Sequence, residues 1–209
     1  MPSTHHGKSR IDGEFTATTL GAVRVGAQSG NVAAQTELAR RLARRNKGTE
    51  ALQWFRSAAR SGDAERQMEL GVVLCWDHGA YRDGLTWIRR AAKQGHVGAQ
   101  YFLGAEFATG VNIRKNLREA LSWYHRAAKQ GHTEAQYNLA MMFWAGEGTR
   151  KNIAEAHKWL NKSAKSNDLL ALRALADAYE SGQLGYRKNR ARADYWQKLY
   201  VRANHNVAR

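Results

Sequence analysis

Apolar and polar positions follow a helical period along the chain, and the whole pattern repeats at intervals of 32, 33, 36 and 36 residues. The pentapeptide Ala-Lys-Gln-Gly-His stands at residues 92–96 and again at 128–132, with more divergent copies elsewhere. One turn residue marks each copy, in the series Gly30, Gly62, Gly95, Gly131 and Asn167. Glycine, and after it asparagine, tolerates a positive φ, so each of these positions predicts a helix end followed by a tight turn.

A first helix is predicted after each turn. The residue eight positions past the turn is always a leucine, and the next residue is small. The leucines are Leu38, Leu70, Leu103, Leu139 and Leu175. Large residues follow at the twelfth position, and the fourth, eighth and twelfth positions lie on one face of an α-helix. The small residue beside each leucine permits close approach of a neighbouring helix.

A second helix is predicted in the later part of each repeat, because a tryptophan recurs there with an alanine or glycine three residues before it. We expect these tryptophans to form the structural core between repeats: Trp54, Trp87, Trp123, Trp159 and Trp196. Asn116 and Asn152 are suited to cap the N-termini of two of these helices, each with a glutamate three residues later. Residues 21–29 read as one more helix of this second type, ahead of the first complete repeat.

The segment Gly-His-Thr-Glu-Ala-Gln-Tyr-Asn-Leu-Ala-Met-Met-Phe at 131–143, followed by Gly-Glu-Gly at 146–148 and Ala-His-Lys-Trp at 156–159, resembles the Sel-one-like repeat. That repeat is a helical hairpin similar to the tetratricopeptide repeat. The resemblance implies an all-α fold, a right-handed α/α superhelical solenoid of five hairpins. The expected repeats are about 30–61, 62–94, 95–130, 131–166 and 167–202. We expect one solenoid over 18–202, a flexible tail over 1–17 and a basic tail over 203–209.

Composition narrows the class of protein. Lys and Arg number 33 against 18 Asp and Glu, which gives a net charge of +15. A single cysteine, Cys75, excludes a disulfide-stapled scaffold, and the single proline, Pro2, suits long uninterrupted helices. No apolar run approaches the roughly 18 residues of a membrane span. No apolar segment of a secretory signal follows the N-terminus, so we expect a cytoplasmic protein.

The chain carries no recognisable catalytic motif. It lacks HExxH, GxSxG, a CxxC pair and a Walker loop. His96 and His132 occupy equivalent positions in successive repeats, too far apart to share a metal ion. Some proteins with similar repeats have been credited with hydrolytic activity, but no nucleophile–base pair is visible in this sequence. We therefore expect no enzyme activity, no metal, no cofactor and no small-molecule ligand.

The resemblance implies that the first helices of the repeats line a concave, partner-binding surface. The residues expected on that surface are Arg40, Arg44, Val72, Trp76, Phe102, Asn138, Met141 and Trp144. Arginine beside exposed aromatic residues is typical of binding hot spots. Two other interpretations stay open: the aromatic residues pack on neighbouring repeats or on a dimer partner, and the basic clusters, such as Arg89, Arg90 and Lys93, form a solvated edge.

Together these features favour a non-enzymatic scaffold or adaptor for protein–protein interaction. We expect its groove to bind an acidic or amphipathic segment of a partner, because the basic charge attracts such segments. The resemblance implies a bacterial regulatory or assembly role. The alternative is a protein that binds nucleic acid or another anionic surface through its charge.

Overall fold

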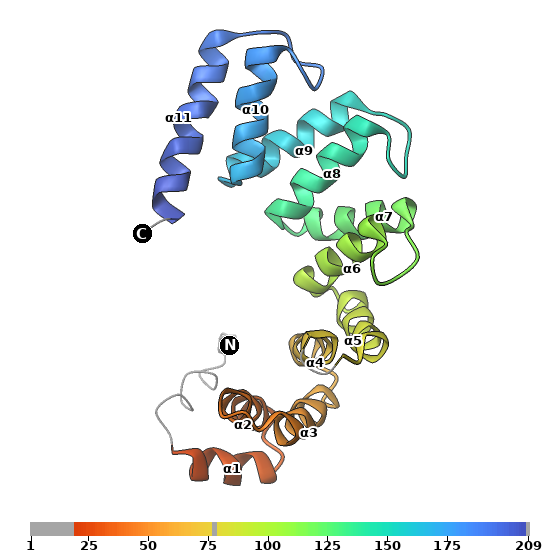
Figure 1. The fold of residues 1–209 in the computed structure, drawn as a ribbon, viewed down its shortest axis with the longest axis vertical. Coiled ribbons are helices and arrows are strands. Elements are labelled where there is room, and N and C mark those ends of the chain that lie inside the picture. The colour runs from red at the N-terminus through yellow and green to blue at the C-terminus, as the bar shows by residue number, and fades with distance from the viewer. Residues whose placement is uncertain (1–18, 77–78, 208–209) are drawn as a thin grey trace, which may run out of the picture. The chain divides into compact units, whose positions relative to one another are not determined.

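The computed structural model describes residues 19–76 and 79–207, so the expected tail over 1–17 lies outside the described residues. The chain divides into two compact units, unit 1 up to His96 and unit 2 from Val97 onward. Every helix or strand assigned within the described residues is an α-helix (Figure 1).

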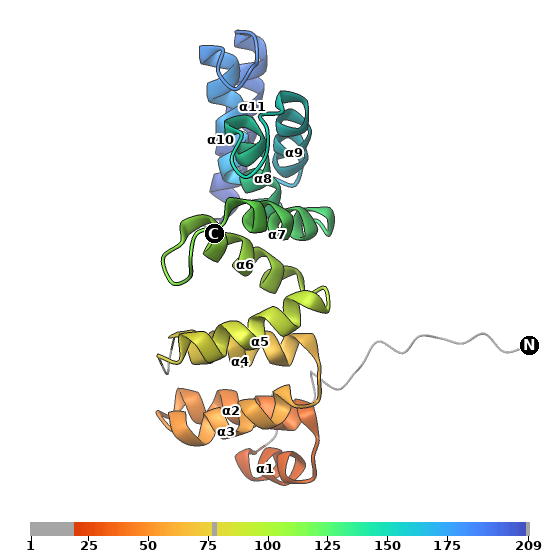
Figure 2. The same cartoon turned by 90° about the vertical axis from the view of Figure 1, so that its right-hand side faces the viewer.

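The described residues of unit 1 form five helices, which are α1 (Leu20–Gln28), α2 (Val32–Arg44), α3 (Gly48–Ala59), α4 (Ala64–Trp76) and α5 (Tyr81–Lys93). Those of unit 2 form six, which are α6 (Val97–Thr109), α7 (Leu117–Lys129), α8 (Thr133–Ala145), α9 (Ile153–Lys165), α10 (Leu169–Ser181) and α11 (Arg190–Val207). From α2 onward the even-numbered helices are the predicted first helices and the odd-numbered ones the second. Each even-numbered helix packs against the odd-numbered helix that follows it, as a hairpin (Figure 2).

The turn positions confirm the repeat. Gly30, Gly62, Gly95, Gly131 and Asn167 all have positive φ, between 61° and 96°. The five leucines of the pattern are completely buried in the first helices. Asn116 and Asn152 cap α7 and α9 as predicted. One boundary differs: α11 continues to Val207, so residues 203–207 are helical where we expected a tail.

The tryptophans contribute less to the core than predicted. Trp159 is 5% exposed and belongs to the core of unit 2. The other four are half-buried: Trp54, Trp87, Trp123 and Trp196. In α3, α5, α7 and α9 the residue after the tryptophan is buried; these residues are Phe55, Ile88, Tyr124 and Leu160. The indoles lie at the edge of this face, where Arg90 stacks on Trp87 and Arg126 on Trp123.

Buried glutamines connect the two helices of a hairpin. Gln94, the C-cap of α5, donates to Oε1 of Gln67 over 2.9 Å, and Gln130, the C-cap of α7, donates to Oε1 of Gln100 over 2.8 Å. The next glutamine in this series, Gln136, is completely buried, and its Oε1 has no hydrogen-bond partner among the described residues. The C-cap that corresponds to Gln130 is Ser166, whose side chain is too short to make the same bond.

We therefore expect Ser166→Gln to stabilise the protein. The new amide supplies the missing donor to Gln136, and satisfying a buried acceptor is worth about 1 kcal/mol in the free energy of unfolding. Chemical denaturation of the variant and the wild type measures this difference. Ser166→Ala serves as the control, because it adds no donor and leaves Gln136 as it is. Equal stability of the Gln and Ala variants would contradict the expectation.

Candidate functional site

The eight residues predicted to bind a partner fall into two sets. Arg40 and Arg44 lie on α2 and Val72 and Trp76 on α4, all in unit 1. Phe102, Asn138, Met141 and Trp144 lie on α6 and α8, in unit 2. Each set is described within its own unit.

In unit 1, Arg40 and Arg44 line one pocket of about 520 Å³, which we call the α2–α4 pocket. Its wall is formed by Arg40, Ala43, Arg44, Asn46, Gly48, Ala51, Phe55 and Val73. Phe55 is a buried residue of the core, and Val73 packs against the same core. The pocket therefore combines an apolar floor with two guanidinium groups, and its volume falls in the range of ligand-binding clefts.

The two arginines of this pocket differ in their availability. The Arg40 Nε donates to Oε1 of Glu69 over 2.6 Å, across from α2 to α4. Burial lowers the pKa of Arg40, but its hydrogen bond to Glu69 and the charges of Glu69, Glu37 and Glu65 outweigh burial and raise the pKa overall. Oε2 of Glu69 is buried without a hydrogen-bond partner among the described residues, so Arg40 is needed to compensate that carboxylate.

Arg44, in contrast, is exposed on the last turn of α2 and forms no ion pair with any described carboxylate. Its guanidinium lines the α2–α4 pocket without an ion-pair partner among the described residues. The other two predicted residues of unit 1 do not line the pocket. Val73 does so in place of Val72, one residue further along α4, and Trp76 is a separate, 66% exposed side chain at the end of that helix.

In unit 2, part of the predicted set is committed to the fold. The Asn138 side chain forms hydrogen bonds with the hydroxyls of Tyr101 and Tyr124, and burial raises the pKa of Tyr124 to about 12. Met141 packs against the core of unit 2. For these two residues the interpretation of packing within the repeats is the better one.

Phe102 and Trp144 are half-buried side chains outside the core of unit 2. The Lys151 ammonium lies 5.2 Å from the centre of the Trp144 ring. These two aromatic residues therefore keep an accessible surface that a partner can contact. They do not line the α2–α4 pocket.

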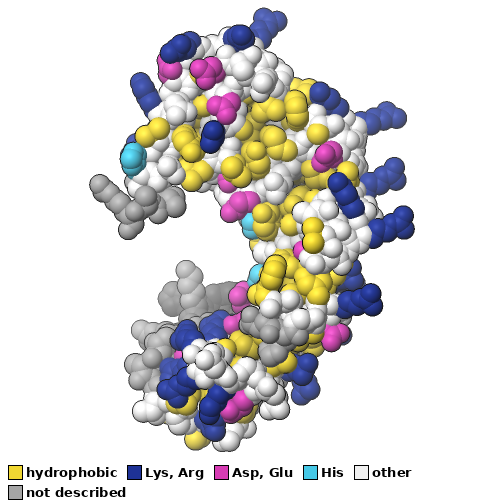
Figure 3. Space-filling model, in the orientation of Figure 1, with side chains coloured by type: hydrophobic (Ala, Val, Ile, Leu, Met, Phe, Trp, Pro, Cys, Tyr) yellow, Lys and Arg dark blue, Asp and Glu magenta, His cyan; other side chains and the backbone are white. Residues whose placement is uncertain are grey.

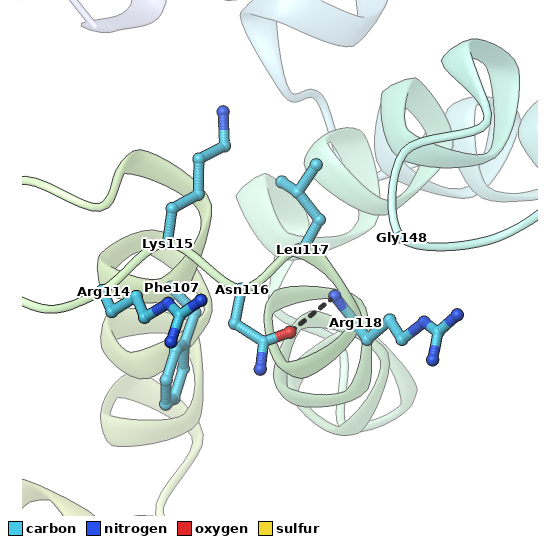
Figure 4. A pocket seen from close by; sticks show the side chains of 7 residues that line it. All are labelled: Phe107, Arg114, Lys115, Asn116, Leu117, Arg118 and Gly148. Atoms are coloured by element: carbon cyan, nitrogen blue, oxygen red, sulfur yellow. Dashed lines mark hydrogen bonds between the residues drawn. The ribbon is translucent and has the colours of Figure 1, made fainter.

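A second pocket, of about 780 Å³, lies between two loops of unit 2 (Figure 4). It is lined by Phe107, Arg114, Lys115, Asn116, Leu117, Arg118 and Gly148. In Figure 4, Arg118 and Lys115 extend away from the N-terminus of α7 in different directions, and Asn116 caps that helix. The sequence prediction missed this cluster. The signal that marks it is the tripeptide Arg-Lys-Asn, which recurs at 114–116, 150–152 and 187–189.

Histidine and cysteine serve the fold in the described residues. His132 accepts a hydrogen bond from Ala135 N at the start of α8 and stacks on Tyr101. Burial lowers the pKa of His132, and the neighbouring Glu134 carboxylate opposes this shift. Cys75 is buried and contacts the Tyr81 carbonyl. Within the described part of the chain, no three metal-binding side chains gather at one point.

Across residues 19–76 and 79–207, no helix combines the length and apolar character that crossing a membrane requires.

Comparison with known proteins identifies the repeat. The model of the Sel1 repeat matches residues 32–63, 80–96, 97–132, 133–168 and 169–196. No curated protein matches the chain. Three similar solved structures come from bacteria, and together with the family match they place the fold among all-α helical-repeat solenoids.

The first is a Sel1 repeat protein from Oxalobacter formigenes, with 24% identity and a TM-score of 0.75, over 88% of this chain and 78% of that one. The second is c5321, a protective antigen of uropathogenic Escherichia coli with an SLR fold, with 27% identity and a TM-score of 0.81. That alignment covers 89% of this chain but only 41% of c5321. The third is immunity protein Pa5087 from Pseudomonas aeruginosa, with 19% identity and a TM-score of 0.55, over 88% of this chain and 73% of that one.

Proposed function

The chain belongs to the Sel1 repeat family, and on that premise we propose that it is a scaffold whose α2–α4 pocket binds an acidic or amphipathic segment of a partner protein. Sel1 repeat proteins are generally protein-interaction scaffolds, and their fold is typically non-enzymatic. A bacterial regulatory or assembly role in the cytoplasm, and one continuous repeat array over 18–202, belong to the same proposal. The bacterial origin of the similar structures supports the first point, and the family matches over 32–63 and 80–196 support the second.

The observation that carries the proposal is the pairing of an apolar floor with a free cation. A side chain of the partner packs against Phe55 and Val73, while a carboxylate of the same segment pairs with Arg44. Apolar anchors surrounded by charge supply most of the energy of protein interfaces, and the net charge of +15 accelerates encounter with an acidic partner. Arg40 holds the wall of the pocket through its bond to Glu69.

The proposal is tested by affinity capture from bacterial lysate, with nuclease present and at moderate salt, using the wild type, Arg44→Glu and Arg45→Glu as baits. Arg45 is exposed next to Arg44 and does not line the pocket, so its reversal is a charge-matched control. We expect a protein that the wild type and the Arg45 variant retain to be lost from the Arg44 variant, with affinity reduced at least about tenfold. If all three baits retain the same partner protein, the α2–α4 pocket does not bind that partner.

A further inference from the structure

Three loops of unit 2 are built in the same way. Each joins an even-numbered helix to the next odd-numbered one and ends on the asparagine of an Arg-Lys-Asn tripeptide. The asparagine N–H donates to a carbonyl near the end of the preceding helix: Asn116 to Phe107 over 2.9 Å, Asn152 to Phe143 over 2.8 Å, and Asn189 to Tyr179 over 2.8 Å. The repeated main-chain bond therefore fixes each Arg-Lys pair at the same place in its hairpin.

Contacts between these loops place the pairs along one edge. A Cβ added to Gly148 would lie 2.2 Å from the carbonyl oxygen of Leu117, the first residue of α7. A Cβ added to Gly185 would lie 2.8 Å from the side chain of Ile153, the first residue of α9. The loops after α8 and α10 thus pack on the starts of α7 and α9, directly after the preceding Arg-Lys pairs. We call the resulting row the Arg-Lys edge, formed by Arg114, Lys115, Arg150, Lys151, Arg187 and Lys188.

The Arg-Lys edge carries positive charge that the fold does not neutralise. All six side chains are exposed, and none forms an ion pair with a carboxylate in the described part of the chain. One acid, the exposed Glu147, shares these loops, and Glu119 and Glu155 stand in the first turns of α7 and α9. Glu155 is already paired with Lys158 and Trp159. Figure 3 shows Lys and Arg side chains projecting where α7 and the loop between α8 and α9 lie.

The fold also fixes where these lysines leave the backbone. The lysines pack beside the glycines that end the preceding helices, Lys115 at Gly110, Lys151 at Gly146 and Lys188 at Gly182. The N-termini of α7, α9 and α11 follow directly and add the positive end of each helix dipole. The three pairs thus stand at the starts of successive odd-numbered helices, one pair in each hairpin of unit 2.

We propose that the Arg-Lys edge binds the phosphate backbone of double-stranded nucleic acid without reading its sequence. Duplex DNA carries one negative charge per about 1.7 Å of helix axis, which suits a row of exposed cations. Interfaces with proteins instead centre on buried aromatic or apolar anchors, whereas the six side chains of this edge are all charged; Phe107 and Leu117, which line the pocket beside Arg114 and Lys115, pack against the core of unit 2. The edge shares no residue with the α2–α4 pocket, so this proposal does not depend on the function proposed for that pocket.

The test is fluorescence anisotropy of a labelled duplex of about 20 base pairs, titrated with the full chain at about 50 to 200 mM salt. The test variant replaces Arg114, Lys115, Arg150 and Lys151 by glutamine. The control replaces four exposed cations of unit 1 by glutamine and so removes the same charge: Arg56, Arg60, Arg82 and Arg89. A second variant, Arg187→Gln with Lys188→Gln, probes the third loop. Thermal melting establishes that each variant is folded.

We expect the four-residue variant of the edge to weaken binding at least about tenfold and the control less than about threefold. The slope of log K against log salt becomes shallower by about 0.9 for each phosphate that the variant no longer neutralises. The second variant, with two substitutions, is expected to weaken binding of the duplex by a smaller factor. The proposal is overturned if the wild type shows no salt-dependent binding, or if the edge variant and the control weaken equally. Tighter binding of a labelled poly-glutamate peptide than of the duplex would overturn it in favour of an acidic protein.

Discussion

Trp159→Ala is expected to lower the free energy of unfolding by about 3–5 kcal/mol, as truncation of a large buried aromatic residue does. Trp159 is 5% exposed within the core of unit 2, and the ring of His125 lies edge-on to its indole. Its indole N–H donates to Oε2 of Glu155 over 2.9 Å. The substitution therefore opens a cavity and removes a hydrogen bond at once. Denaturant unfolding of the full chain measures the loss.

Trp123→Ala is the matched control, since Trp123 holds the equivalent position in the previous hairpin. Its indole is half-buried beneath the Arg126 guanidinium and lies outside the core of unit 2. We expect less than half the destabilisation of Trp159→Ala, because less apolar surface is buried there. Equal destabilisation by the two substitutions would contradict the expectation that the loss of stability follows the burial of the tryptophan.

Gly84→Ala is expected to cost about 1–3 kcal/mol, because the backbones of α4 and α5 pass too closely to admit a methyl group. A Cβ at Gly84 would lie 2.5 Å from the Gly71 carbonyl oxygen and 2.5 Å from the Cys75 sulfur. At the positions equivalent to Gly84 in the other four repeats stands an alanine, namely Ala51, Ala120, Ala156 and Ala193. In the second repeat, the two helices therefore meet at a glycine on each helix, Gly71 on α4 and Gly84 on α5.

Gly21→Ala provides the comparison for this substitution. Gly21 is exposed in α1, and the one neighbour of an added Cβ is the Thr19 hydroxyl at 4.0 Å. Alanine there raises helix propensity, so we expect a gain of up to about 1 kcal/mol. The melting temperatures of the two variants therefore shift in opposite directions. A stabilised Gly84→Ala protein would show that α4 and α5 separate without cost.

Binding surfaces were harder to infer from sequence than the fold. Arg40 and Arg44 were both expected to meet a partner, and both line the same pocket. Yet Arg40 is held by Glu69, which is 29 residues away in sequence, and Arg44 is not. On α4 the pocket is lined by Val73 and not by the expected residue, Val72. An error of one residue along a helix does not affect the prediction that the helix exists. It does change which side chain lines a binding site.

The sequence by itself determined the helices, their order and their buried leucines, because helical period and positive φ are local properties of the backbone. The turn residues and the five leucines occupy the predicted positions without exception. Tertiary structure alone decided which polar groups are paired: Asn138 with two tyrosines, Arg40 with Glu69, and Oε1 of Gln136 with no partner among the described residues. It also decided that Gly148 packs on Leu117, which aligns the basic loops. Such residues are far apart in sequence, and only the packing of helices within and between hairpins brings them together.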